Sequence, residues 1–362
     1  MSILSLNRVW KRTDNAFWLK NITFEIHEGD WLLISGPVGQ GKEELQQILL
    51  GFDTDWDGEI LLHKKSIKEI TSYNDKIAFI PNMIMDEQKL ESVYEYLAFP
   101  LKIQELSEEK IAEEIHSVAK NIDPFIDLEK PIKELSFKEG VLITCIRAIL
   151  SKPSLIIIDE PFYQFPNSKR KEIIHVVKEF HDNWAGCPVV IFSSYNKEWL
   201  SFVNRLAIIQ GYELLQIGDP KSLVEEPKSI FVAKYIHGEG FTLLRGKLKG
   251  NHFTSNGFSC SLPLIKFSED KFYEGQDVVI GIHATSFQIN EGRDTSDIVL
   301  KVPVHIVLEE DFYYKLYTNV DSQPLVAHVK KSGKMNEGEQ IQLSLPFENL
   351  LFFDRNTEKR LM

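Results

Sequence analysis

The sequence predicts an α/β domain with a mostly parallel sheet, followed by a second domain built from β-strands. Over residues 1–236, short apolar segments typical of buried strands alternate with segments of helical periodicity, which is the pattern of an α/β domain. After residue 241 the chain changes to short β-type segments separated by turn sequences such as KGN and NEG. A length of 362 residues is sufficient for two domains with separate hydrophobic cores.

We therefore expect a first domain over residues 1–236 and a second over 241–362, the latter a small β-barrel of the OB type. Residues 87–120 are rich in helix formers and are interrupted by Pro100. They predict a helical subdomain at about 83–134, inserted between the strands of the first domain. The strands expected in that domain are 19–26, 29–35, 76–82, 154–160, 188–194 and 205–210.

The charge, cysteine content and apolar segments of the chain limit the partners and the compartment that we expect. The formal net charge of −12 argues against nucleic acid or an anionic membrane surface as a partner. The three cysteines, Cys145, Cys187 and Cys260, are far apart and odd in number, which indicates a reducing compartment without a disulfide framework. No apolar segment approaches 18 residues. We expect a cytoplasmic protein that reaches a membrane only by docking onto a protein there.

The segment WLLISGPVGQGKEE, at residues 31–44, is the strongest functional signal in the chain. It matches G-x-x-x-x-G-K from Gly36 to Lys42, with an apolar strand before it and a helical pattern after it. In such a loop, backbone N–H groups and the lysine hold the phosphates of a nucleotide. The alternative is an ordinary strand–turn–helix with chance glycines. The residues expected to contact nucleotide here are Gly36, Pro37, Val38, Gly39, Gln40, Gly41, Lys42, Glu43 and Glu44.

Glu43 departs from this motif, which normally places a Mg²⁺-binding Ser or Thr after the lysine. A carboxylate about 4 Å from a phosphate charge is repelled by roughly 4 kcal/mol at an effective dielectric constant of 20. A Mg²⁺ ion bound directly by Glu43 would offset much of that repulsion, since carboxylates are good Mg²⁺ ligands. We therefore expect Glu43 either to weaken ATP binding or to act as a metal ligand.

A second apolar strand ends in two carboxylates, in SLIIIDEP at residues 154–161. In P-loop nucleotide hydrolases the first carboxylate, here Asp159, reaches Mg²⁺, and the second, here Glu160, polarises the attacking water. An apolar strand ending in Asp-Glu is common without function. Its position downstream of a P-loop favours the catalytic interpretation.

These motifs together resemble the ATP-binding subunits of ABC transporters, in particular the sugar and polyol importer class that carries a C-terminal β-rich (TOBE) extension. The resemblance covers nearly the whole chain. KIAFIPN at 76–82 occupies the place of the Q-loop, and LSFKEG at 135–140 is in register with the signature motif. In the extension, the resemblance is carried by FVAKYIHGEGFTLLRGKL, VVIGIHATSF and LPFENLLFFDRNTEKRL.

The resemblance implies ATP and Mg²⁺ as cofactors and a peripheral position on the inner face of the cell membrane. It also implies two ATPase subunits beneath two permease subunits, with each ATP held between the P-loop of one ATPase and the signature motif of the other. The extension would serve as a regulatory and dimerisation module. Sugar is the cargo implied, while polyol phosphates, polyamines and metal ions stay open.

Several positions depart from the family pattern. The glutamine of the Q-loop falls on Asn82, and the switch histidine falls on Ser194. In the signature motif Ser136 is kept, but Phe137 and Lys138 replace both glycines. Glycines there let backbone N–H groups approach the γ-phosphate, and side chains should hinder that approach.

Two further positions bear on the nucleotide. Pro166 stands where the D-loop aspartate is expected. Trp10 is the better candidate for the aromatic side chain that stacks on adenine, because Thr13 occupies the alternative register.

Three hypotheses for function follow. The first is a degenerate ATPase subunit of an ABC importer that pairs with a second, intact ATPase chain, so that a heterodimer is favoured over a homodimer. The second is a nucleotide-sensing or structural scaffold that hydrolyses nothing. The third is a slow homodimeric ABC ATPase.

Overall fold

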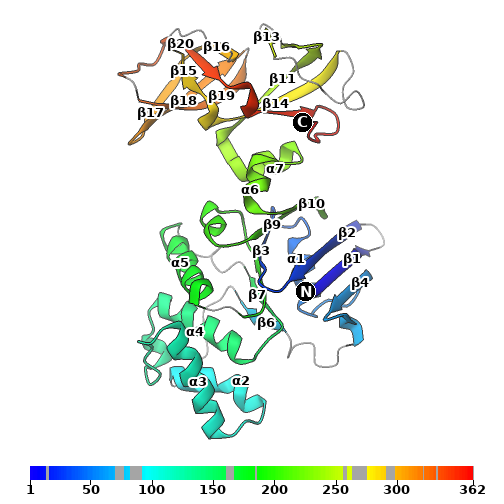
Figure 1. Ribbon diagram of the computed structural model, residues 1–362, viewed down its shortest axis with the longest axis vertical. Coiled ribbons are helices and arrows are strands. Elements are labelled where there is room, and N and C mark those ends of the chain that lie inside the picture. Colours follow the sequence, from blue (N-terminus) through cyan, green and yellow to red (C-terminus); the bar gives the residue numbers. More distant parts are fainter. Residues whose placement is uncertain are drawn as a thin grey trace. The chain divides into compact units, whose positions relative to one another are not determined.

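The computed structural model describes two compact units, Met1–Pro220 and Lys221–Met362 (Figure 1). The residues that it describes are 1–13, 16–69, 77–81, 92–159, 167–183, 186–255, 259–262, 275–290, 298–320, 322–331 and 333–361. Within these residues no helix is both long and apolar enough to cross a membrane.

A six-stranded sheet forms the centre of the first unit, in the order β10-β9-β3-β8-β7-β6. All neighbouring pairs run parallel except β9 and β10, which are antiparallel. The parallel strands are short, apolar and largely buried, as expected for strands covered on both faces. The mostly parallel sheet predicted from the sequence is confirmed. Its strands are β3 (Trp31–Ser35), β6 (Ile77–Ile80), β7 (Leu155–Asp159), β8 (Val189–Phe192), β9 (Arg205–Gln210) and β10 (Glu213–Gly218).

A second, antiparallel sheet in the order β2-β1-β4-β5 shares a core with the first. Helix α1 (Lys42–Leu49) supplies Leu45, Ile48 and Leu49 to this core, and it begins at Lys42, the last residue of the predicted P-loop. The strands of this sheet are β1 (Ser2–Thr13), β2 (Ala16–His27), β4 (Asp57–Leu62) and β5 (Lys65–Ser66), followed by the 3-10 turn Ile67–Glu69.

The helical subdomain contains α2 (Val93–Ile103) and α3 (Glu108–Ile122), both inside the expected range 83–134. The expected interruption at Pro100 is wrong, because α2 continues through this residue to Ile103. Proline in a helix removes one N–H donor and costs about 3 kcal/mol. Burial of apolar side chains of α2, including Leu97 and Leu101, offsets that cost.

Two further helices belong to the first unit. They are α4 (Phe137–Leu150), which leads into β7, and α5 (Asn167–Asn183), which precedes β8. Short 3-10 turns lie at Ile132–Glu134 and Lys197–Ser201.

The second unit begins with helices α6 (Pro220–Glu225) and α7 (Ile230–His237) and continues as three antiparallel sheets. The orders are β13-β12-β11-β14-β21, β15-β20-β16 and β17-β18-β19, and apolar residues from all three sheets share one core. The strands are β11 (Phe241–Lys249), β12 (His252–Thr254), β13 (Ser259–Ser261), β14 (Gln276–His283), β15 (Gln288–Ile289), β16 (Ile298–Pro303), β17 (Ile306–Glu309), β18 (Tyr313–Val320), β19 (Gln323–Lys330), β20 (Gln340–Leu345) and β21 (Leu350–Asp354).

The boundary between the units lies earlier than the expected one between residues 236 and 241. Helix α7 belongs to the second unit because Ile230 and Ala233 pack with Phe241, Val279 and Phe353 in one apolar cluster. The domain bound expected at residue 236 placed α7 in the α/β domain, whereas the resemblance of residues 231–248 to the extension had already linked most of this helix to the strands that follow. The packing of Ile230 and Ala233 decides between the two.

This boundary predicts how fragments of the first unit behave. A fragment 1–220 should be monodisperse, whereas a fragment 1–236 should aggregate because Ile230 and Ala233 would lose their apolar partners. Light scattering after size-exclusion chromatography measures the difference. Ile230→Ser in the longer fragment should reduce the aggregation. Equal monodispersity of both unsubstituted fragments would assign α7 to the first unit instead.

Candidate functional site

The carboxyl edge of the six-stranded sheet gathers the residues that the sequence singled out. The loop 36–42 follows β3, Asp159 ends β7, and Ser194 follows β8, which lies between these two strands. Ile34 is paired with Phe192, and Phe192 with Asp159, so these residues form one row across the sheet. Since parallel strands end at the same edge, the predicted phosphate loop, metal ligand and switch position lie at one edge.

Two glycines of the loop are required by its packing. A side chain at Gly36 would overlap the carbonyl oxygen of Ile209 in β9. Gly41 has φ +109°, and a Cβ there would lie 3.1 Å from the Cα of Tyr212 and 3.2 Å from Leu19. Both glycines therefore let the loop lie close against the strands behind it, a role that the sequence motif alone does not reveal.

Gln40 ties the loop to the turn between β9 and β10. Its side-chain oxygen accepts the N–H of Gly211 at 2.9 Å, and its carbonyl oxygen accepts the N–H of Tyr212 at 3.0 Å. Val38 and Gly39, at the front of the loop, are exposed. The loop is thus held from behind while its front faces solvent, with Pro37 between the buried and the exposed part.

Glu43 folds back over the front of the loop. One carboxylate oxygen accepts the N–H of Gly39 at 3.2 Å, and the other lies 3.4 Å from the Nζ atom of Lys42. The Lys42 side chain is 2% exposed and that of Glu43 is 39% exposed. The lysine is therefore fixed, and the carboxylate rests on it from the solvent side.

Glu44 is the neighbouring acid in the first turn of α1 and is half-buried. Burial raises the pKa of its carboxyl group, the charge of Glu43 raises it further, and Lys11 opposes the shift. In the part of the chain that the structure describes, no donor reaches its Oε2 atom, which is fully enclosed. The first turn of α1 therefore holds two acids of different character, one over the loop and one directed into the protein.

The signature motif forms a capped helix start. Ser136 is the N-cap of α4: its hydroxyl accepts the N–H of Glu139, and the Glu139 carboxylate accepts the N–H of Ser136 at 2.7 Å. The Lys130 ammonium group donates to the same carboxylate at 2.7 Å. These hydrogen bonds, with Lys130 foremost, lower the pKa of Glu139 to about 2. The amino end of α4 thus carries an anion supplied by the chain itself at neutral pH.

Phe137 and Lys138 occupy the first two positions of α4 without disturbing it. Lys138 is exposed and forms an ion pair of 3.1 Å with Glu179 of α5. This chain therefore accommodates the two side chains that replace the glycines. Any effect they have is on a molecule that binds at the amino end of α4.

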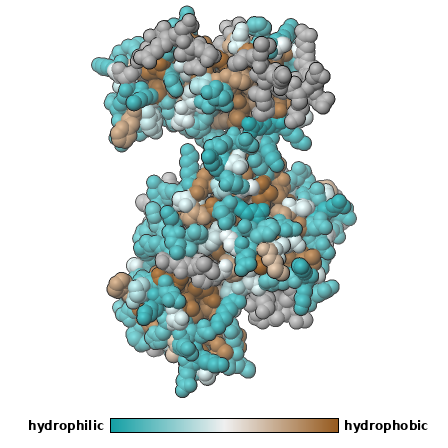
Figure 2. Space-filling model, in the orientation of Figure 1, coloured by the Kyte–Doolittle hydropathy of each residue, from teal (hydrophilic) through white to brown (hydrophobic). Residues whose placement is uncertain are grey.

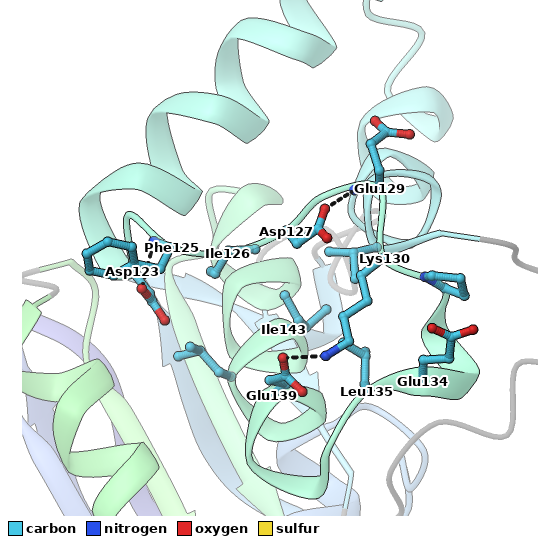
Figure 3. A pocket seen from close by; sticks show the side chains of 13 residues that line it. Asp123, Phe125, Ile126, Asp127, Glu129, Lys130, Glu134, Leu135, Glu139 and Ile143 are labelled. Atoms are coloured by element: carbon cyan, nitrogen blue, oxygen red, sulfur yellow. Dashed lines mark hydrogen bonds and ion pairs between the residues drawn. The ribbon is translucent and has the colours of Figure 1, made fainter.

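A hollow of about 410 Å³ lies beside α4 in the helical subdomain. Figure 3 shows Lys130 reaching across it to Glu139, with Asp127 and Glu129 above and Glu134 at the side. Its floor is apolar, with Ile126, Leu135, Leu142 and Ile143 among the lining residues.

Trp10 lies in β1, where its ring contacts that of Phe17 at a centroid distance of 5.9 Å. An aromatic residue closer to the loop was missed by the sequence analysis. The backbone oxygen of Trp18 would lie 3.3 Å from a Cβ at Gly41, and the Trp18 ring contacts that of Tyr212. Trp18 lies beside Gly41 because strand β2 runs behind the loop. The FW dipeptide at 17–18 is the one signal that could have drawn attention to it.

Some predicted residues lie outside the described part of the chain, namely Asn82, Glu160 and Pro166. Ser194 is described and exposed. Among the described residues no group of three or more His, Cys, Asp or Glu side chains could hold a metal ion. Mg²⁺ is usually held by one or two carboxylates together with substrate phosphates and water. The carboxylates of Asp159 and Glu43 are of the ligand type that Mg²⁺ prefers, and their role as metal ligands stays a prediction.

Comparison with known proteins agrees with this geometry. Residues 19–163 match the family model described as ABC transporter, and the match spans β3, the loop and β7. The chain carries an ABC transporter domain. Such domains bind ATP, and the loop at 36–42 that the sequence predicts as the phosphate-binding loop lies within the matched range.

Curated relatives of the ABC domain align over the full length of the chain. The sulfoquinovosyl glycerol transport ATP-binding protein SmoE of Agrobacterium fabrum is 23% identical, with 100% of both chains covered. The spermidine/putrescine import ATP-binding protein PotA of Fusobacterium nucleatum is 24% identical and covers 99% of this chain and 92% of its own length. An uncharacterized ABC transporter ATP-binding protein, YurJ of Bacillus subtilis, is 22% identical with 99% of each chain covered.

Solved structures match the fold over about two thirds of the chain. The cbiO1 protein of Clostridium perfringens, part of the cbiONQ complex, aligns with a TM-score of 0.56 and 22% identity, covering 62% of this chain and 91% of its own. The ADP conformation of the ATP-binding cassette MJ1267 aligns with a TM-score of 0.55 and 20% identity. The alignment covers 66% of this chain and 100% of MJ1267. These matches confirm the predicted P-loop ABC-type α/β fold.

The half-buried Glu44, whose Oε2 atom is enclosed, predicts a stability effect that depends on pH. Its folded-state pKa is raised, so the charged form destabilises the fold, and stability is lost as pH rises through the folded pKa. Glu44→Gln should therefore raise Tm more at pH 7 than at pH 4, by about 2–4 °C for each kcal/mol recovered. Thermal unfolding at both values measures this, with the exposed Glu59→Gln as the control. A larger gain at pH 4 would contradict the assigned shift.

Proposed function

We propose that the chain is the ATP-binding subunit of an ABC-type importer whose own site binds ATP but hydrolyses it weakly or not at all. The observation that carries the proposal is the phosphate-binding loop on β3, in a chain that aligns end to end with transport ATP-binding proteins. The names of two relatives refer to a sulfoquinovosyl glycerol and to spermidine or putrescine. A sugar or related solute is the cargo that we favour.

Weak hydrolysis is supported at the switch position and at the signature motif. Ser194 lies at the carboxyl edge between the loop and Asp159, but it has a shorter reach than histidine and carries no charge. Losing one preorganised group that stabilises a transition state costs about 3–4 kcal/mol, which lowers a rate by a factor of several hundred. In our proposal Asp159 and Glu43 hold Mg²⁺, and Glu160 polarises the attacking water.

The partner side of the proposal rests on α4. In the ABC arrangement the signature motif of one subunit closes the nucleotide site of the other. Lys138 and Phe137 would obstruct the close approach of backbone N–H groups to phosphate. We therefore favour a second, different ATPase chain as partner, in a heterodimer rather than a homodimer.

Coupling to the permease is assigned to the helical subdomain. Exposed apolar side chains gather there, and Figure 2 shows brown patches at its surface. The hollow of Figure 3 adds acidic groups beside that surface. We place the chain on the inner face of the cell membrane, held by permease subunits. The exposed apolar residues are Phe99, Ile103 and Phe125.

The second unit is assigned to a TOBE-type regulatory domain related to the OB barrel. Three sheets around one core, at the carboxyl end of an ABC chain, support this assignment. Its role would be to hold two ATPase chains together while the nucleotide is exchanged.

A scaffold that senses nucleotide without hydrolysing it is the second candidate. It is favoured by the carboxylates of Glu43 and Glu139, since each already satisfies cationic or N–H groups near the places where phosphate would lie. A slow homodimeric ATPase is the third, and it requires Lys138 to be tolerated at the partner's nucleotide.

The composition of the native complex tests the proposed assembly. Affinity isolation of the chain from its own membranes, followed by intact-complex mass spectrometry, should yield one copy with one other ATPase and two permease chains. Two copies without a second ATPase would contradict the heterodimer and leave the homodimer or the scaffold. Recovery without any permease would contradict the importer.

Turnover of the assembled complex tests hydrolysis at this site. Phosphate release should be slow, and Glu160→Gln should lower it by less than the same substitution in the partner ATPase, since the intact chain carries most of the turnover. Ser194→His should raise the residual rate by restoring a charged group. If Glu160→Gln in this chain abolishes turnover of the whole complex, the site is fully active and the proposal of weak hydrolysis is wrong.

A further inference from the structure

The Glu43 carboxylate contacts the two kinds of group by which a phosphate-binding loop holds its ligand. One oxygen accepts a backbone N–H from the exposed front of the loop, at Gly39, and the other lies beside the ammonium group of Lys42. The distance from the carboxylate to the Gly39 nitrogen is 3.2 Å, and the distance to the Lys42 Nζ atom is 3.4 Å. The chain's own carboxylate thus makes both contacts.

These groups are the ones that an incoming phosphate needs. The loop offers backbone N–H groups and one lysine, and the amino end of α1 adds a favourable field for anions. A carboxylate resembles one face of a phosphate because it presents two oxygens and a negative charge. Since two anions cannot share the Gly39 N–H, a phosphate at this position excludes the carboxylate.

The fixed parts of this arrangement make the contact specific. Lys42 is nearly fully buried, and the loop is bound from behind through Gln40. Only the carboxylate is free to leave, because the Glu43 side chain is 39% exposed. An exposed ion pair contributes little to the free energy of folding, so a strongly binding ligand can displace the carboxylate at a small free-energy cost.

We propose that Glu43 is a built-in competitor for phosphate, which occupies the loop in the nucleotide-free protein and must be displaced before a nucleotide binds. This inference rests on the proposed nucleotide-binding function and names the residue that regulates that site. The carboxylate of Glu43 therefore determines which anions enter: free polyphosphates are repelled, and only a ligand that tolerates or neutralises a nearby carboxylate is retained.

The decisive ligand is ATP in the presence of EDTA. Without a divalent cation the carboxylate cannot serve as a metal ligand, so its effect on phosphate is isolated. Glu43→Gln removes the charge at nearly constant shape and should tighten metal-free ATP binding by about 10- to 100-fold, the Coulomb repulsion reduced by partial exposure. Isothermal titration calorimetry on the full chain measures it. Glu59→Gln, with the same change of charge at an exposed site on β4, should leave the affinity unchanged.

A second measurement needs no nucleotide. In the free protein the Gly39 N–H is hydrogen-bonded only while Glu43 occupies the loop, so Glu43→Ala should accelerate its hydrogen exchange by about tenfold. The chain has 20 glycines, and ¹⁵N-glycine labelling makes this amide observable by NMR. The amide of Gly211, which Gln40 holds, is the internal control and should not change.

The two measurements separate the inference from the function on which it rests. Tighter binding together with faster exchange at Gly39 would establish Glu43 as the competitor. Unchanged exchange at Gly39 would overturn the inference, whatever the affinity for ATP. Faster exchange without ATP binding in any variant, with or without Mg²⁺, would overturn the proposed nucleotide function while the occupation of the loop by Glu43 stands.

Discussion

The close packing of the phosphate-binding loop against β9 and β10 is the constraint on which the candidate site depends. Gly36 packs against the carbonyl group of Ile209, and Gly41 packs against Tyr212. Gln40 accepts hydrogen bonds from the turn between the two strands. The loop is therefore positioned by strands that come more than 160 residues later in the chain (205 − 42 = 163). Any change that moves β9 or β10 also moves the N–H groups that face the ligand.

Two carboxylates give this ABC domain its particular electrostatics. Glu43 lies over the P-loop, and Glu139 caps the signature helix with the help of Lys130. In both places a carboxylate of the chain satisfies donors that lie at or near the amino end of a helix, where anions are stabilised. A nucleotide that displaced Glu43 would have to replace these contacts, so it would gain less free energy on binding than at a loop whose donors face water.

The parallel sheet of the first unit was accessible from the sequence, because its strands are short, apolar and bounded by turns. The loop, β3, α1 and β7 were all placed by motif and periodicity together. Pro100 and α7 were not. In each case tertiary burial decided the outcome: the packed face of α2 outweighs a lost hydrogen bond, and strands of the second unit cover Ile230 and Ala233. Neither effect leaves a trace in a local window of residues.

The sequence by itself determined that this protein has a P-loop, a parallel sheet with Asp159 at a strand end, and altered residues at Glu43, Phe137, Lys138 and Ser194. These are properties of residue identity and spacing, and a linear pattern records them completely. Only the tertiary structure decided where the altered side chains point. It turned Glu43 toward Gly39 and Lys42, paired Lys138 with Glu179, and placed Trp18 behind the loop. The reason is physical: the direction of a side chain is set by the donors, charges and surfaces around it, and most of these come from distant parts of the chain.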